Sequence, residues 1–189
     1  MTRAQIIQTQ ERVGTVPDGF WGPKSIAATK RHLRRLCPEP NPWPSSSQRA
    51  LRAFYGPPED NSEITRVPAP SWLRLYDDPD KRVRSIACHS KVADSLLRAL
   101  RDAYQHAPDM VRRYFGAHVD RPMRGSRTPS THAYGAAVDL AASTNRNRQA
   151  WPVSANMPLE VMDAFAREGW TPAGAFWGRD AMHFQATRP

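Results

Sequence analysis

The sequence predicts an α+β protein in which a small, mostly antiparallel sheet is flanked by helices and preceded by a small helical module. Three observations support this prediction. Apolar residues recur at helical spacing over residues 90–106, short apolar runs typical of strands follow that segment, and two short helical segments open the chain. Elements grouped in this order favour α+β over a regular alternation of strands and helices.

The N-terminal helical module comprises residues 1–37. A weak apolar pattern indicates a helix over residues 4–13, and the sequence Pro-Asp-Gly at positions 17–19 then signals a tight turn. A second helix is predicted over residues 24–36, because Pro23 is well tolerated in a first turn and apolar residues follow at helical spacing. The two helices form a hairpin around the sequence DGFWGPKS.

A connector of residues 38–60 follows this module. Its sequence PEPNPWPSSS contains four prolines, which remove backbone donors and favour an extended chain. A short helix is predicted over residues 47–54, ending at Gly56 and two prolines. We therefore place the domain boundary in this connector and assign residues 61–189 to the larger domain.

The larger domain combines helices with short strands. A strand is predicted at residues 83–87, an amphipathic helix at 90–106 and a further helix at 158–167. The segment between residues 61 and 82 has no clear periodic pattern. Three more strands are predicted, at residues 118–123, 135–141 and 182–185.

The chain is basic. Its 189 residues include 27 lysines and arginines against 18 aspartates and glutamates, which gives a formal net charge of +9. Such a surface attracts polyanions and anionic envelopes at low salt. The basic residues are spread over helical segments and form no long basic arm, so a solvated basic surface is favoured and no specific nucleic-acid partner is expected.

The sequence lacks the signals of an exported or membrane protein. The segment MTRAQIIQTQERVG has no apolar core of the length that a secretory signal needs, and no later stretch could span a membrane. We expect the chain to be made in the cytoplasm and to be monomeric. Cys37 and Cys88 are too few for a four-thiolate zinc site, so free thiols are expected, with a single bridge as the alternative.

Two segments of the larger domain carry residues suited to metal chemistry. The sequence STHAYGAAVD at residues 130–139 holds a histidine and an aspartate, and WGRDAMHFQ near the C-terminus holds a second histidine in an apolar strand. Catalytic zinc takes three protein ligands, commonly imidazole nitrogens and carboxylate oxygens, and leaves a fourth position to water. His132, Asp139 and His183 supply such a set.

The spacing of His132 and Asp139 excludes a continuous helix between them. Seven residues of helix would separate the two side chains by about 10 Å along the axis, which is too far for one metal ion. The segment must therefore bend, and Gly135 permits such a turn. Asp180 lies three residues before His183 and is the candidate that takes a proton from a metal-activated water and delivers it to a leaving amine.

The pattern SxHxxGxAxD followed by DxxHF resembles that of the VanY-like metallopeptidases, which include D-alanyl-D-alanine carboxypeptidases and L-alanyl-D-glutamate endopeptidases. The resemblance covers roughly residues 83–185, and the combined spacing is specific for a short motif. It implies that His132, Asp139 and His183 bind Zn²⁺. It also implies that Asp180 is the general base.

The same resemblance implies two further site positions. It places Ser130 near the metal. It also implies an arginine upstream of the first motif that stabilises the developing oxyanion, a role that suits a guanidinium. Arg121 and Arg124, in the sequence DRPMRGS, both match this arginine, with Arg121 slightly favoured.

The N-terminal sequence DGFWGPKSIAA resembles the core of peptidoglycan-binding domains joined to cell-wall hydrolases. Together the two matches resemble a modular endolysin of a phage or prophage. This resemblance implies a zinc-dependent endopeptidase that cleaves the stem peptide of bacterial peptidoglycan, most often at the L-Ala-D-Glu bond, after release to the cell wall through a holin-made lesion. For the N-terminal match, a structural hairpin that binds nothing is the alternative.

Two other functions stay open. A housekeeping D-Ala-D-Ala carboxypeptidase would share the chemistry but would normally need export, for which the sequence shows no signal. A non-catalytic basic protein that binds cell wall or nucleic acid would keep only a vestigial metal site. It would bind polyanions in a salt-dependent way and hydrolyse nothing.

Overall fold

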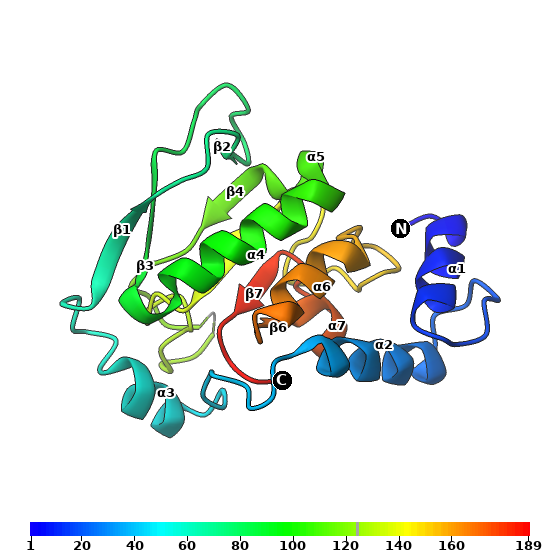
Figure 1. Ribbon diagram of the computed structural model, residues 1–189, viewed down its shortest axis with the longest axis horizontal. Helices are drawn as coiled ribbons and strands as arrows, with labels where there is room; N and C mark the ends of the chain where they lie inside the picture. The colour runs from blue at the N-terminus through cyan, green and yellow to red at the C-terminus, as the bar shows by residue number, and fades with distance from the viewer. Residues whose placement is uncertain (124) are drawn as a thin grey trace.

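A sheet of five strands lies at the centre of the described part of the chain (Figure 1). The computed structural model describes residues 1–123 and 125–189, so Arg124, one of the two arginines predicted at the oxyanion, lies outside the described residues. The parallel pair β2–β4 forms one edge, and the pairs β4–β5, β5–β7 and β7–β6 are antiparallel. The strands are β2 (Arg74–Leu75), β4 (Arg113–Gly116), β5 (Ala137–Leu140), β7 (His183–Gln185) and β6 (Thr171–Pro172).

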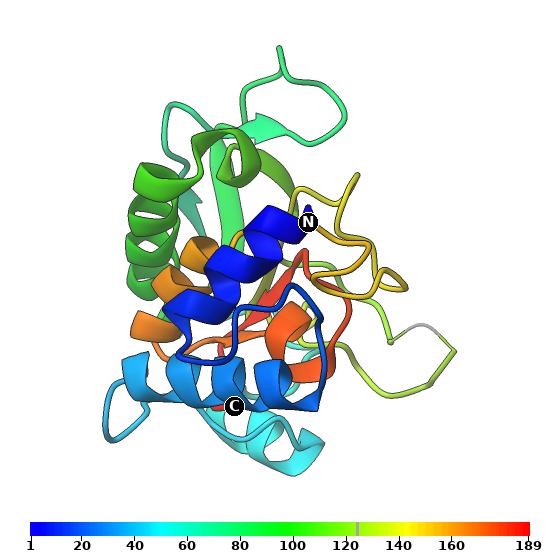
Figure 2. The ribbon, with the colours of Figure 1, turned by 90° about the vertical axis from the view of Figure 1, so that its right-hand side faces the viewer.

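Helices cover one face of this sheet (Figures 1 and 2). Helix α4 (Ala93–His106) follows a 3-10 turn at Ser90–Val92 and packs against α6 (Leu159–Arg167). The core between helices and sheet is fully buried at Leu96, Phe165 and their neighbours. This arrangement of a mostly antiparallel sheet with flanking helices confirms the predicted α+β class.

Smaller elements complete the larger domain. Strands β1 (Ile64–Pro68) and β3 (Ser85–His89) form a separate antiparallel pair. Helix α3 (Gln48–Tyr55) begins at the Ser47 cap and ends at Gly56, as predicted for the connector. The remaining short helices are α5 (Pro108–Val111) and α7 (Ala173–Trp177).

The two N-terminal helices pack against α6 through a buried carboxylate. They are α1 (Arg3–Arg12) and α2 (Pro23–Leu36), and Figures 1 and 2 show them on the same side of the molecule. Asp163 of α6 is fully buried and lies 2.7 Å from Arg12 Nη2 and 2.8 Å from His32 Nε2. The α2 side chain Leu33 is also fully buried and belongs to the same core as α4 and α6. The division of the chain into separate domains stays a prediction.

Most of the predicted elements are confirmed to within two residues, but the strand predicted at residues 118–123 is wrong. The chain instead forms β4 at Arg113–Gly116, and residues 118–123 contribute only an isolated bridge at Pro122. Pro122 has no amide hydrogen to donate to a strand ladder, which disfavours a regular strand in this segment. Strands β1, β2 and β6 were not predicted. The first two lie in the segment between residues 61 and 82, which has no clear periodic pattern, and β6 has only two residues.

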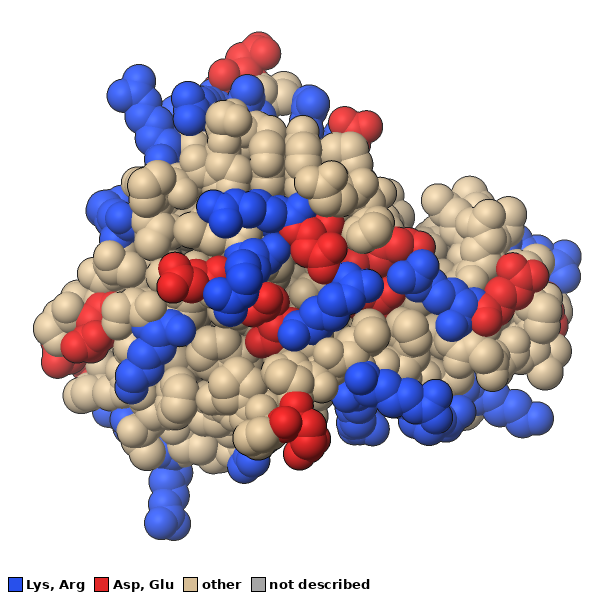
Figure 3. All heavy atoms as spheres, viewed as in Figure 1, with Lys and Arg blue, Asp and Glu red and all other residues tan. Residues whose placement is uncertain are grey.

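Basic and acidic side chains alternate over the face drawn in Figure 3. Across α4 and α6, Arg98 pairs with Glu168 at 2.8 Å and Arg167 pairs with Asp102 at 2.6 Å. The sequence of α2 contains no acidic residue, and basic side chains gather along it at the lower edge of this view. Helix α2 therefore contributes a basic strip to this face of the molecule.

Cys37 and Cys88 are both free thiols. Cys88 lies in the core of β3, and burial raises the pKa of its thiol to about 11, so the group is uncharged at neutral pH. Among the helices formed by the described residues, none combines the length and apolar character that a membrane crossing needs.

Candidate metal centre

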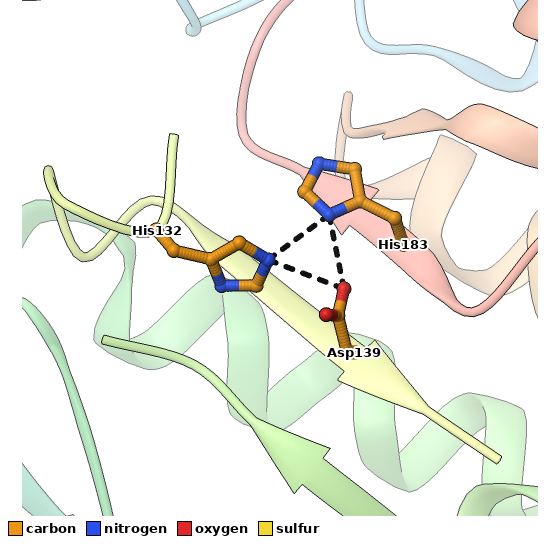
Figure 4. Close-up of side chains that lie close together, drawn as sticks. All are labelled: His132, Asp139 and His183. Carbon is orange, nitrogen blue, oxygen red and sulfur yellow. Dashed lines mark hydrogen bonds and ion pairs between the residues drawn. The ribbon is translucent and has the colours of Figure 1, made fainter. Parts of the chain in front are cut away.

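The three predicted metal ligands come together on one face of the central sheet (Figure 4). Asp139 on β5 and His183 on β7 are cross-strand partners, so their side chains lie on the same face. Val138 and Phe184, the next residues along each strand, belong to the core on the opposite face, because side chains alternate along a strand. His132 reaches the same point from the turn that precedes β5.

Gly135 forms the bend that the sequence predicts between His132 and Asp139. Its φ of +64° lies in the left-handed region that glycine adopts readily. A Cβ atom at this position would come within 2.6 Å of the backbone nitrogen of His89 and 2.7 Å of Ile64 Cδ1. The turn therefore needs glycine both for its backbone conformation and for the space beside β3.

The three donor atoms are close enough to share one ion. The distance from His132 Nε2 to His183 Nδ1 is 3.1 Å, and these atoms lie 3.2 Å and 2.9 Å from Asp139 Oδ1. Ligands held at about 2.0–2.1 Å from a tetrahedral zinc are roughly 3.3 Å from one another. Each residue is buried, with an exposed fraction of 6% or less.

Hydrogen bonds on the outer sides of both imidazole rings determine which nitrogens face the centre. His132 Nδ1–H donates to the carbonyl oxygen of Ala117 at 2.5 Å, which leaves a lone pair on Nε2. His183 Nε2–H donates to Gln185 Oε1 at 3.1 Å, which leaves a lone pair on Nδ1. Gln185 is itself oriented by the hydrogen bond that it donates to Thr187 Oγ1. The lone pairs of two imidazole nitrogens and one carboxylate oxygen thus point toward the same place. Their electron density is stabilised when a cation lies between them.

The electrostatics of Asp139 suit a metal ligand. Burial alone would raise the pKa of this carboxyl group, but the adjacent imidazole groups of His132 and His183 outweigh burial and lower its pKa below the ordinary value. The group is therefore ionised at neutral pH. A buried carboxylate beside two imidazole nitrogens is a donor set that zinc accepts.

Asp180 lies beside this centre in a strained conformation. Its φ of +60° is unusual for a residue with a side chain, and its carbonyl oxygen accepts the backbone N–H of His183 at 2.9 Å. Burial raises the pKa of Asp180 above its ordinary value. Its Oδ1 atom is buried and has no hydrogen-bond partner within the described residues. Such an oxygen is available to a water molecule or a substrate group.

The metal centre opens into a cleft of about 400 Å³. The ring of Trp177 stacks on His183 with 5.5 Å between ring centroids, and 48% of Trp177 is exposed. Helix α3 forms part of the wall, where Gln48 donates to the carbonyl oxygen of Pro129 at 3.0 Å and accepts from Tyr134 Oη at 2.8 Å. A segment predicted as part of a connector therefore contributes to the cleft.

Of the other predicted site residues, Ser130 supports the turn that carries His132, whereas Arg121 faces the cleft. Ser130 is buried, and its hydroxyl accepts the backbone N–H of His132 at 3.1 Å, so this side chain stabilises the ligand-bearing turn. Arg121 lines the cleft. Sequence reasoning missed Gln48, Arg179 and Gln185, because no short motif connects them to the ligands.

We expect Gln185→Leu to weaken zinc binding by about 10-fold to 100-fold, because the variant loses the acceptor that orients His183. Competition against a chromophoric chelator would measure this change. Gln8→Leu, on an exposed position of α1, is the matched control and should bind zinc like the unmodified protein. Equal affinity of the Gln185 variant would show that another group orients the imidazole.

Two buried histidines, a buried carboxylate and a second carboxylate beside them are the parts of a metallopeptidase centre. Residues 124–186 match a family model described as D-alanyl-D-alanine carboxypeptidase, and this segment contains all three predicted ligands and Asp180. No curated protein and no solved structure shows a significant match to the chain. At the level of class, the family match supports a metallopeptidase that acts on peptidoglycan.

Proposed function

We propose that this protein is a zinc-dependent endopeptidase that hydrolyses an amide bond in the stem peptide of bacterial peptidoglycan, with the L-Ala-D-Glu bond as its target. The observation that carries the proposal is the convergence of His132, Asp139 and His183 at distances that suit one zinc ion, with Asp180 beside them in the same cleft. The family match over this segment supports the same class of substrate.

Each residue of the centre has a distinct part in this reaction. When bound, zinc activates a water and polarises the scissile carbonyl. Asp180 accepts the proton of the attacking water and then delivers it to the leaving amine, a role that its unpartnered Oδ1 atom allows. Arg121 lines the cleft and can stabilise the negative charge that develops on the carbonyl oxygen.

The N-terminal hairpin is proposed to hold the enzyme on the cell wall, as in a phage endolysin that reaches the wall through a holin lesion. Phe20 of the DGFWGPKS sequence is 73% exposed, and Val16 nearby is 63% exposed. By contrast, Trp21 packs edge-on against Trp151 at 5.1 Å between centroids and so contributes to the structure. The exposed pair supports a binding surface on this hairpin.

Mass spectrometry of purified peptidoglycan digested with the zinc-loaded protein tests the proposal. We expect new amino termini at D-Glu and new carboxyl termini at L-Ala. Release of single D-Ala residues would instead identify a carboxypeptidase, the activity named by the matching family model. Salt-dependent binding to the wall without any new terminus would identify a non-catalytic protein. Metal-stripped protein is the control for each digestion.

A further inference from the structure

We propose that Arg179 binds the free α-carboxylate of the substrate residue whose amine is released. This inference rests on the proposed function and adds to it a determinant of substrate specificity. Arg179 is the chain neighbour of Asp180, and both residues line the cleft of the metal centre. Arg179 is neither one of the three predicted metal ligands nor the arginine to which the oxyanion role is assigned.

The backbone around Arg179 is fixed relative to the metal ligands. The residue lies between Gly178, with a φ of +72°, and Asp180, with a φ of +60°. On one side, the backbone N–H of Trp151 donates to the carbonyl oxygen of Gly178 at 3.1 Å. On the other side, the backbone N–H of His183 donates to the carbonyl oxygen of Asp180 at 2.9 Å. The turn therefore holds Arg179 at a constant place beside the centre.

The guanidinium of Arg179 is available for an anionic ligand. Several arginines of the chain, among them Arg12, Arg52 and Arg98, form ion pairs with carboxylates. Arg179 is exposed, and no carboxylate of residues 1–123 and 125–189 lies within ion-pair distance of it. An arginine can bind a carboxylate through two parallel hydrogen bonds, which makes it selective for that group.

The chemistry of the leaving residue places a carboxylate at this position. Asp180 delivers a proton to the leaving nitrogen, and the α-carboxyl carbon of that residue is only about 2.5 Å from the nitrogen. In the L-Ala-D-Glu bond, D-Glu continues the stem through its side chain, so its α-carboxylate is free. The terminal D-Ala of a D-Ala-D-Ala bond carries a carboxylate at the same position. An ordinary polypeptide has an uncharged amide there, so Arg179 would favour both wall substrates over proteins.

Matched pairs of soluble muropeptides test this inference in the full-length, zinc-loaded protein. One pair carries either D-Glu or D-isoglutamine, in which the α-carboxylate is an amide, and a second pair ends in D-Ala-D-Ala as the acid or the amide. For the pair that is cleaved, we expect kcat/KM to be roughly 10-fold to 100-fold higher on the acid. Arg179→Gln should remove this preference by slowing the acid substrate only. Arg101→Gln, on an exposed position of α4, should leave it unchanged.

Equal losses on the acid and the amide in Arg179→Gln would overturn the inference, as would a protein that cleaves both forms equally well. If no pair is cleaved, the proposed function fails. Calorimetric binding of the peptide D-Glu-γ-Lys-D-Ala then tests, without any hydrolysis, whether Arg179 binds the α-carboxylate. Tighter binding of its acid than of its α-amide, lost in Arg179→Gln, would support a carboxylate site. Equal binding of the two peptides would exclude it.

Discussion

Asp180→Asn is expected to retain zinc and to lose roughly 10²-fold to 10⁴-fold in kcat on a soluble muropeptide, the range attributed to general acid–base groups. The amide keeps the size of the carboxylate but cannot accept a proton from the attacking water. Zinc should stay bound, because the three donor atoms of His132, Asp139 and His183 converge without a contribution from Asp180. Elemental analysis and steady-state kinetics measure the two quantities on the same sample.

Asp109→Asn provides a matched control for this substitution, because it removes one carboxylate whose side chain is 89% exposed. It should leave both zinc content and kcat unchanged. Loss of zinc in Asp180→Asn would make Asp180 a ligand and would require a new role for Asp139. Full activity of the variant would mean that the proton acceptor lies elsewhere.

Replacement of any one ligand by alanine is expected to remove zinc and to lower hydrolysis to the level of the uncatalysed control. Two protein ligands cannot complete the three-ligand set of a catalytic zinc site. His132→Ala, Asp139→Ala and His183→Ala should therefore behave alike in elemental analysis and in turnover. His106→Ala, at a partly exposed position at the end of α4, should retain both zinc and activity.

Metal loss can also unfold a protein whose site is part of its core, so circular dichroism of each ligand variant is needed beside the activity measurement. A variant that is folded, metal-free and inactive supports the proposed centre. Full hydrolysis by a metal-free preparation of the unmodified protein would contradict it, whatever the behaviour of the variants.

The local geometry of the metal centre could be predicted from sequence, because short-range constraints determine it. The separation between His132 and Asp139 demanded a bend, and the glycine between them supplied one. His183 lay in a short apolar strand, whose alternation directs it away from the core. Each of these inferences needs only the spacing of residues and the geometry of a helix or a strand.

The walls of the cleft could not be predicted in this way, because their contacts join distant parts of the chain. Gln48 bonds to Tyr134, which lies 86 residues further along the sequence. No periodic pattern records such a contact. Strand β4 was missed for a related reason. The strand was predicted at residues 118–123, whereas pairing with β5 selects Arg113–Gly116.

The carboxylate of Asp163 has a consequence for recombining this protein with others. A chimera that joined residues 38–189 to a foreign targeting module would lose Arg12 and His32, the two partners of this buried group. Deleting α1 and α2 would expose this carboxylate to water and would also expose the apolar surface that Leu33 covers; burial of one leucine side chain contributes about 1.5–3 kcal/mol. A transplantable cassette would therefore have to carry α1 and α2 with it.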